Sequence, residues 1–326
     1  MRKPRQEIKS PQDPSSPRYA DITLDNNREE TDSTKNRLAT VSQEICGLAA
    51  ENSSTAWLAT ITLDNARDGT SSTKDRLETI SQVITNLAAE GYPTGGVLLF
   101  PGGWLDAREA VPDADYCKRT TATLAPALQG TGHTVCFGID GGKDAEGFAR
   151  DQLALAVREG EGICAMGRKF APSPQEVGHV SLCKNFAAGE AGYPRNFTHR
   201  GKTFFLAVCY DVYGISHGAG PNPGADAVLN CVHCFYPQGQ GPSGVQYFAK
   251  LGFAGASKQW GCPVFGTAVF YDRNMPVRWP TGVMWTSGEK STKKWRYDEN
   301  PLVPSVVFGM KKDKGKITVR VFDGGW

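Results

Sequence analysis

The chain has 326 residues, a formal net charge of +2, and 40% hydrophobic and 21% charged residues. This composition excludes a wholly disordered chain, and the near-balanced charge excludes nucleic-acid binding driven by overall basicity. No apolar run approaches the roughly 18 residues of a membrane-spanning helix, and the N-terminal residues lack the apolar core of a signal peptide. The nine cysteines are spread through apolar stretches, as in proteins of a reducing compartment. We therefore expect a cytoplasmic protein with no membrane or nucleic-acid partner.

The first part of the chain contains an internal duplication. Residues 22–51 and 61–90 are identical at 20 of 30 positions, at an offset of 39. Two copies are too few for a solenoid, so a local duplication is indicated. Each copy predicts a short strand, a polar loop and an amphipathic helix, with Thr34 and Thr73 as candidate helix caps.

The duplication divides the chain into three parts. The second copy leads directly into an apolar strand, whereas the first looks redundant. We predict a disordered, charged and Pro/Ser-rich tail over residues 1–18, a duplicated strand-helix appendage over 19–55, and one main domain over 56–326.

The main domain alternates apolar strands with helical patterns. Helices are predicted over about 142–151 and 243–259. This interleaving predicts an α/β fold with helices covering the faces of a sheet. The predicted strands cover 96–101, 134–139, 153–158, 163–168, 204–210, 225–230, 264–270 and 317–322.

One strand ends at a cysteine that is a candidate nucleophile. The apolar run from Phe204 to Val208 is followed by Cys209, Tyr210 and Asp211. Reactive groups of α/β folds are placed where a strand ends and the chain turns. A nearby cation would lower the thiol pKa and favour the nucleophilic thiolate. The alternative is a buried structural cysteine.

The surrounding motifs favour the nucleophile. A strand with Pro101 comes first, then GICAMGRKF ending near Lys169 with Glu176 behind it, then VCYD around Cys209, then GADAVLN over 224–230. This order resembles the nitrilase superfamily, the carbon–nitrogen hydrolases, over residues of about 56 to 323. The VCYD and GADAVLN pieces are its most specific parts.

The resemblance implies an αββα sandwich and a cysteine hydrolase without a cofactor. Cys209 would attack the carbon of a small amide or nitrile and form a thioester, Lys169 would stabilise the developing charge, and Glu176 would orient the lysine. The substrate would lie near Tyr210 and near a segment after GADAVLN that contains His233, Cys234 and Phe235. The resemblance also implies a homodimer.

The chain departs from the family at the expected general base. The usual Phe-Pro-Glu becomes Phe-Pro-Gly, with Gly102 in place of the glutamate. Asp106 and Glu109 are the carboxylates that follow in sequence. General acid–base catalysis contributes roughly 10²–10⁴-fold, so hydrolysis could be impaired. A catalytically inactive ligand-binding or interaction protein is therefore the alternative, and a Gly102→Glu change is expected to raise hydrolysis if only the base is lacking.

Two other chemistries remain open. Cys231 and Cys234 have the spacing of half a zinc site, but no second pair at matching spacing accompanies them, so we predict no metal. His199 and His217 flank Cys209 in sequence, which leaves a Cys–His pair as a rival to the lysine-based site. Trp104 and Tyr213 are further candidates for the substrate pocket.

Overall fold

The structure is a computed structural model. It describes residues 56–67, 72–107, 114–241, 243–286, 288, 291–312 and 315–326. The predicted tail over 1–18 and the predicted appendage over 19–55 lie outside the described residues, as do Thr34 and Glu109. No helix in the described ranges is long and apolar enough to span a bilayer.

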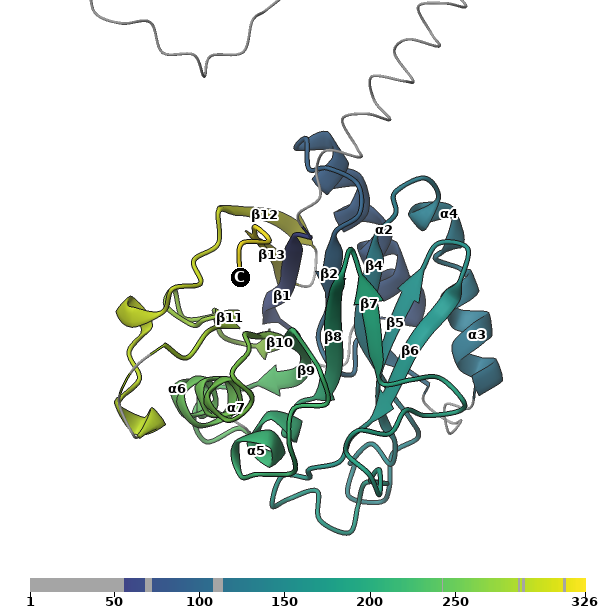
Figure 1. Cartoon of the computed structure of the whole chain (residues 1–326). Helices are drawn as coiled ribbons and strands as arrows, with labels where there is room; N and C mark the ends of the chain where they lie inside the picture. The colour runs from purple at the N-terminus through teal and green to yellow at the C-terminus, as the bar shows by residue number, and fades with distance from the viewer. Residues whose placement is uncertain are drawn as a thin grey trace, which may run out of the picture. The chain divides into compact units, whose positions relative to one another are not determined.

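The described residues form one mixed sheet around which the helices are arranged (Figure 1). Its strands follow in the order β6 (Gly162–Arg168), β5 (Gln152–Arg158), β4 (Thr134–Asp140), β2 (Val97–Leu99), β1 (Leu58–Ala66), β10 (Val264–Tyr271), β9 (Ala227–Phe235), β8 (Lys202–Val208) and β7 (Asn196–His199). Four further strands attach to this path, namely β3 (Leu105–Asp106), β11 (Gly282–Val283), β12 (Val306–Lys312) and β13 (Gly315–Phe322).

The middle of the sheet is parallel and its margins are antiparallel. Strands β4, β2, β1, β10, β9 and β8 run parallel to one another along this path. Antiparallel pairing adds β5 and β6 beside β4, β7 beside β8, and β13 beside β1. Parallel strands covered on both faces read as unbroken apolar runs. All eight predicted strands are confirmed, with shifts of a few residues at their ends.

The sheet folds back so that its two halves face each other. Strands β5 and β6 lie against β8, and β4 lies against β9. The core between the halves includes Leu99, Ala154, Leu206 and Leu229, all fully buried. The result is a nearly closed, barrel-like sheet with an inner core.

Helices cover the two outer faces (Figure 1). On one face lie α2 (Thr73–Ala89), α3 (Ala114–Ala122) and α4 (Ala125–Leu128). On the other lie α5 (Asp211–Ser216), α6 (Val245–Tyr247), the π-helical turn η1 (Phe248–Phe253) and α7 (Ala254–Trp260), while the short 3₁₀ turns η2 (Thr292–Lys294) and η3 (Tyr297–Glu299) follow β11 along the chain. Helices therefore cover both outer faces of the folded sheet, which confirms the predicted α/β fold class.

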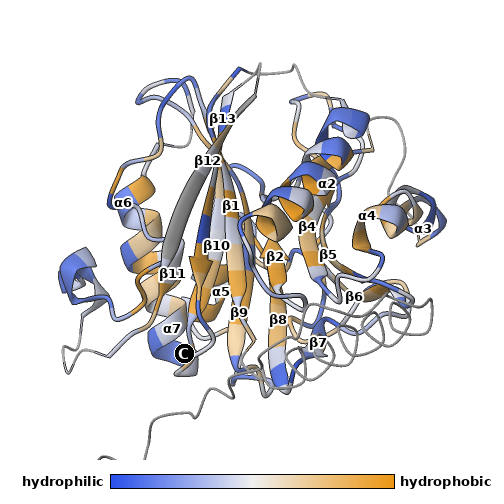
Figure 2. Cartoon of the chain, turned by 90° about the horizontal axis from the view of Figure 1, so that it is seen from above, coloured by the Kyte–Doolittle hydropathy of each residue, from blue (hydrophilic) through white to orange (hydrophobic). Residues whose placement is uncertain are grey.

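Helix α2 shows how the duplicated sequence pattern folds in its second copy. Ile80, Val83, Ile84 and Leu87 are buried on one side of the helix, and Figure 2 shows apolar residues on its inner side and polar residues outside. The helix begins one residue earlier than predicted: Ser72 is the cap, because its hydroxyl accepts a hydrogen bond from the Asp75 amide while the Asp75 carboxylate accepts one from Ser72. Thr73 is the first helical residue, so its prediction as the cap is wrong.

The helix predicted over 142–151 is absent, and this segment is a loop. The Asp144 carboxylate accepts hydrogen bonds from the backbone amides of Glu146 and Phe148. Such side-chain bonds compete with helical hydrogen bonding, and Gly147 has φ +84, outside the helical region. The second predicted helix, over 243–259, is confirmed as α6, η1 and α7.

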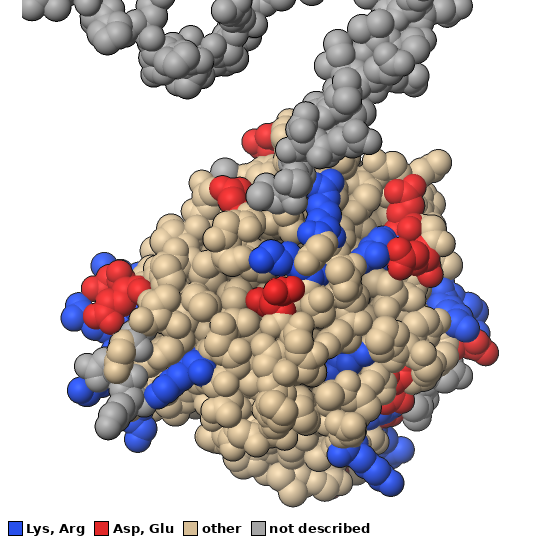
Figure 3. Space-filling view, viewed as in Figure 1, with Lys and Arg blue, Asp and Glu red and all other residues tan. Residues whose placement is uncertain are grey.

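Charged side chains of both signs are interspersed on the face seen in Figure 3, among mostly uncharged residues. This distribution agrees with the small net charge of +2.

Candidate active site

Cys209 lies at a sharp turn between β8 and α5. Its φ is 48°, in the left-handed region that residues with a side chain rarely adopt. The turn is held by β9: the Cys209 amide donates to the Cys231 carbonyl at 2.9 Å, and the Asn230 side chain donates to the Cys209 carbonyl at 3.0 Å. Backbone strain that its surroundings maintain is typical of functional positions.

The buried carboxylate of Asp211 fixes this turn to the neighbouring lysine segment. It accepts hydrogen bonds from the backbone amides of Val208, Phe170 and Ala171 at 2.8–2.9 Å. Arg195, also fully buried, lies 3.6 Å away and compensates part of the charge. Burial raises the pKa of Asp211, while Arg195 and the three amides oppose the rise. The segments that carry Cys209 and Lys169 are therefore held together by one anion.

Lys169 follows the end of β6 and its side chain is completely buried. The ammonium donates to Gln152 at 2.7 Å and to Glu176 at 2.7 Å. Glu176 is held in turn by the amide of Ser173 at 2.7 Å. Burial raises the pKa of Glu176, but Lys169 and these hydrogen bonds outweigh it and lower the pKa to about 2. The second carboxylate oxygen of Glu176 also lies 2.7 Å from the ammonium, so Gln152 and both oxygens of Glu176 fix the lysine, whose charge acts on Cys209.

Two glycines that follow β2 and Pro101 lie close to β9 and to the end of β4. A Cβ on Gly102 would lie 2.6 Å from the Cys231 carbonyl oxygen and 3.0 Å from His233 Nδ1. A Cβ on Gly103 would lie 2.6 Å from the Asp140 carboxylate. The Gly102 amide also donates to Val232 at 2.9 Å, which draws this corner onto β9. The space where the family's glutamate is expected is thus occupied by other residues.

His233 and Asp140 are the residues that fill this corner. His233 Nε2 lies 2.8 Å from the Asp140 carboxylate, and each side chain is 17% exposed. The pairing of β9 with β10 shifts by one residue between Cys231 and Cys234. A bulge of this kind can re-aim a side chain, and bulges are common next to active sites. The other ring nitrogen, Nδ1, is buried and makes no hydrogen bond of standard geometry to a described residue.

Cys209 and His233 influence each other electrostatically. Burial raises the pKa of the Cys209 thiol, but the positive charge of Lys169 and the proximity of His233 more than offset this, so that the thiol pKa is lowered. Burial lowers the pKa of His233, but Asp140 and Cys209 together raise it above its ordinary value. Both shifts favour a thiolate paired with an imidazolium, the form of a cysteine that reacts with electrophiles.

The sequence-predicted site residues divide into two groups. The structure brings Cys209, Lys169, Glu176 and His233 into one electrostatic cluster, and Tyr210 is adjacent, with its ring stacked on Tyr213 at 4.4 Å. Their roles in catalysis and binding remain predictions.

Other predicted pocket residues contact the core. Phe235 is 3% exposed and its ring contacts Phe270 and Trp279. Cys234 is half-buried and packs against the core cluster that includes the buried residues of α2. Trp104 is buried under the guanidinium of Arg76, which lies 4.3 Å from its ring centroid, and its place in the substrate pocket stays a prediction.

The two histidines proposed as rivals lie elsewhere. His199 is buried and contacts Thr134 and the Gly95 carbonyl through its ring nitrogens, at 2.9 and 2.8 Å. His217 is exposed at the end of α5 with its ring against Tyr213. Asp106 ends the short β3 with its backbone paired to Asp140. Neither His199 nor His217 has a contact with Cys209 among the described residues; the histidine that influences the Cys209 pKa is His233.

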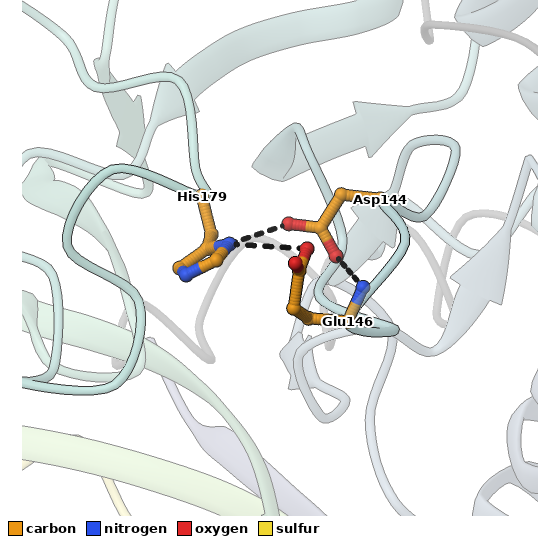
Figure 4. Close-up of side chains that lie close together, drawn as sticks. All are labelled: Asp144, Glu146 and His179. Atoms are coloured by element: carbon orange, nitrogen blue, oxygen red, sulfur yellow. Dashed lines mark hydrogen bonds and ion pairs between the residues drawn. The ribbon is translucent and has the colours of Figure 1, made fainter.

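One group of side chains in the described ranges could hold a metal ion, and it is not the Cys231–Cys234 pair. Asp144, Glu146 and His179 place their ligand atoms within 4.8 Å of one another (Figure 4). His179 Nδ1 lies 2.8 Å from Asp144 and 3.7 Å from Glu146. These contacts join the loop after β4 to the loop that carries Glu176, which is a sufficient structural role for the cluster.

Sequence reasoning missed Asp140, Gln152 and Asn230. Asp140 ends the buried strand β4, where its carboxylate is the charged end of an apolar run. That position is the signal that could have suggested it, since polar residues at strand ends commonly serve a site. Gln152 and Asn230 are polar residues within apolar strands, and both are buried.

No known family model matches the sequence, and no curated protein sequence is similar to it. The fold is similar to that of an amidase from Nesterenkonia sp., with a TM-score of 0.52 and 12% identity over 82% of this chain and 90% of that chain. A cysteine-to-alanine variant of the amidase from Nesterenkonia sp. AN1, in complex with butyramide, gives a TM-score of 0.52 and 12% identity over 83% and 92% of the two chains.

A cysteine-to-serine variant of the Nesterenkonia AN1 amidase, described as belonging to the nitrilase superfamily, has a TM-score of 0.51 and 12% identity over 82% of this chain and 91% of that chain. A glutamate-to-leucine variant, with the acetamide moiety of fluoroacetamide added covalently at the active-site cysteine, gives a TM-score of 0.52 and 13% identity over 82% and 91%. At these identities the similarity shows a shared fold: a mixed, nearly closed sheet covered by helices.

Proposed function

We propose that this protein is a hydrolase of carbon–nitrogen bonds in small amides or nitriles, acting through a thioester on Cys209. The observation that carries the proposal is the placement of Cys209 on a strained turn, where its thiol pKa is lowered against the effect of burial by Lys169 and His233. A thiolate is the nucleophile of such reactions, and a buried cation beside it can stabilise an oxyanion.

Lys169 has the properties that charge stabilisation requires. Its ammonium is completely shielded from water and fixed by Gln152 and Glu176. A preorganised charge in a water-excluded site needs no reorganisation when negative charge develops on the substrate. Glu176 balances the lysine in the resting protein and orients it toward the cysteine.

The partial burial of the site favours a small substrate. Glu176 and His233 have side-chain exposures of 12% and 17%, and the stacked rings of Tyr210 and Tyr213 lie beside the cysteine. The structurally similar Nesterenkonia amidase has been seen with butyramide and with an acetamide adduct. Short aliphatic amides are therefore the first substrates to test.

The test is ammonia release from a panel of short amides and nitriles, combined with mass spectrometry of the intact protein. We expect turnover by the unaltered protein and an acyl adduct at Cys209, both lost in Cys209→Ala. Cys164 offers a matched control, because its thiol is also partly exposed but burial raises its pKa to about 11. Cys164→Ala should keep full activity, and turnover that survives in Cys209→Ala would refute the proposal.

A catalytically inactive ligand-binding protein on the same fold is the second candidate, because Gly102 lacks the carboxylate of the family's base. Fluoroacetamide, an amide-shaped alkylating reagent, separates the two. Rapid labelling of Cys209 without ammonia release from any amide or nitrile would support the binding protein.

A further inference from the structure

We propose that His233, oriented by Asp140, is the general acid–base residue that serves Cys209. It would carry out the proton transfers for which this chain has no glutamate at residue 102. The inference rests on the proposed function, which it deepens by naming the proton carrier. It makes the site a cysteine–histidine–aspartate arrangement with a lysine for charge stabilisation.

The first argument is spatial replacement. A side chain at residue 102 would begin 3.0 Å from His233 Nδ1, so the imidazole occupies the position into which a glutamate at that residue would project. A side chain at residue 103 would collide with Asp140 at 2.6 Å. Gly138 completes the corner, because a Cβ there would lie 2.6 Å from the Gly102 Cα. Three glycines thus leave room for the histidine and its carboxylate.

The second argument is that the two ring nitrogens of His233 have different surroundings. A carboxylate only accepts hydrogen bonds, so the 2.8 Å contact with Asp140 requires the proton to be on Nε2. In a neutral ring this leaves the lone pair on Nδ1, the nitrogen that is buried and makes no standard hydrogen bond to a described residue. Asp140 is therefore a positioning residue that fixes the tautomer with its lone pair on Nδ1, the nitrogen on the Gly102 side, in a histidine close enough to Cys209 for each to shift the pKa of the other.

The third argument is the rigidity of the pair. The bulge in β9 turns His233 toward Gly102, and the Gly102 amide holds that bulge through Val232 at 2.9 Å. The neighbouring Cys231 carbonyl accepts the Cys209 amide at 2.9 Å. The same short stretch of β9 therefore positions both the nucleophile and the histidine.

The proton follows one route through both halves of the reaction. Nδ1 takes the thiol proton, and the thiolate forms a carbon–sulfur bond to the amide carbon while the carbonyl electron pair moves to oxygen beside Lys169. The imidazolium then protonates the leaving nitrogen, the electron pair on oxygen re-forms the carbonyl of a thioester, the carbon–nitrogen bond breaks and ammonia departs. Water next gives a proton to Nδ1 and attacks the thioester, the carbon–sulfur bond breaks, and the proton returns to sulfur.

The test is the rate of Cys209 alkylation by iodoacetamide as a function of pH, measured by peptide mass spectrometry, which needs no knowledge of the substrate. Because His233 favours the thiolate, His233→Gln should shift the alkylation profile to higher pH and lower the rate at pH 6 by tenfold or more. Asp140→Asn should give a smaller shift in the same direction, and Asp140→Glu should restore part of it. His217→Gln is the matched control, since that histidine is exposed and contacts Tyr213 instead.

A second variant distinguishes proton transfer from a structural role. His233→Ala should lose amide turnover and regain part of it when imidazole is added, with thermal unfolding used to check that the variant is folded. An unchanged alkylation profile in His233→Gln, with turnover intact, would overturn the inference and leave the proposed function standing. If the alkylation profile shifts in His233→Gln but the unaltered protein turns over no amide or nitrile, the proposed function would be overturned and the cysteine–histidine pairing would stand.

Discussion

Gly102 is the residue at which the sequence and the structure predict opposite outcomes for one mutation. From the sequence, a Gly102→Glu change restores the family's carboxylate and is expected to raise hydrolysis. In the structure, even the first carbon of that side chain would lie 2.6 Å from the Cys231 carbonyl oxygen and 3.0 Å from His233 Nδ1. We therefore expect Gly102→Ala, and more strongly Gly102→Glu, to lower activity.

The magnitude follows from the contact distances. Carbon–oxygen contacts are ordinarily about 3.3 Å or longer, so the Cβ or its neighbour must move by roughly 0.7 Å. The Gly102 amide is held to Val232 at 2.9 Å, so the backbone resists moving away. Overpacking of this kind costs about 1–3 kcal/mol, or several degrees in Tm for a domain of this size. Displacement of Nδ1 should reduce turnover by at least about tenfold, within the roughly 10²–10⁴-fold that acid–base catalysis contributes.

The assay compares thermal unfolding, Cys209 alkylation near pH 6 and amide turnover in Gly102→Ala and in Gly244→Ala. Gly244 is the matched control, because an added Cβ there would meet nothing closer than the Tyr247 Cβ at 3.9 Å. Neither glycine has φ in the left-handed region, so backbone strain does not separate them. A Gly102→Glu protein with unchanged Tm and higher turnover would show that the corner accepts the carboxylate, and the reasoning would be refuted.

Two further predictions concern buried charges. Glu176→Gln leaves the Lys169 ammonium uncompensated and should reduce the free energy of unfolding by about 3–5 kcal/mol at neutral pH. The pKa of Glu176 in the folded protein is lowered from 4.5 to about 2, so its stabilisation is present above pH 4.5 and is lost as the pH falls toward 2. The free energies of unfolding in urea of the unaltered protein and of Glu176→Gln should therefore converge in acid. Persistence of the full difference at low pH would contradict this. Asp211→Asn should lower the free energy of unfolding by about 3 kcal/mol or more, because it removes the charge partner of Arg195. The same change should slow the alkylation of Cys209. An unchanged alkylation rate in a destabilised protein would show that the carboxylate does not hold the turn.

The strands and part of the site followed from local patterns. Unbroken apolar runs indicated eight strands, because a strand that is covered on both faces has no polar side to present. Cys209 and Lys169 follow the ends of β8 and β6, and the sequence linked them through the order of motifs that resembles the nitrilase superfamily. The segment over 142–151 was misread, since an Asp144 side chain that bonds its own loop leaves little signal in residue composition.

The sequence by itself determined that a cysteine ends an apolar strand, that a lysine and a glutamate occupy the motif before it, and that the expected glutamate base is a glycine. Only the tertiary structure showed which side chains lie beside Gly102, and so led to the proposal that His233 takes the role of that base. Asp140 and His233 are 93 residues apart in sequence and meet because β4 and β9 lie in facing halves of the folded sheet. The motif order pointed to the segment that contains His233, but the pairing with Asp140 depends on a bulge in β9 and on the room left by Gly102 and Gly103, which no local pattern of residues encodes.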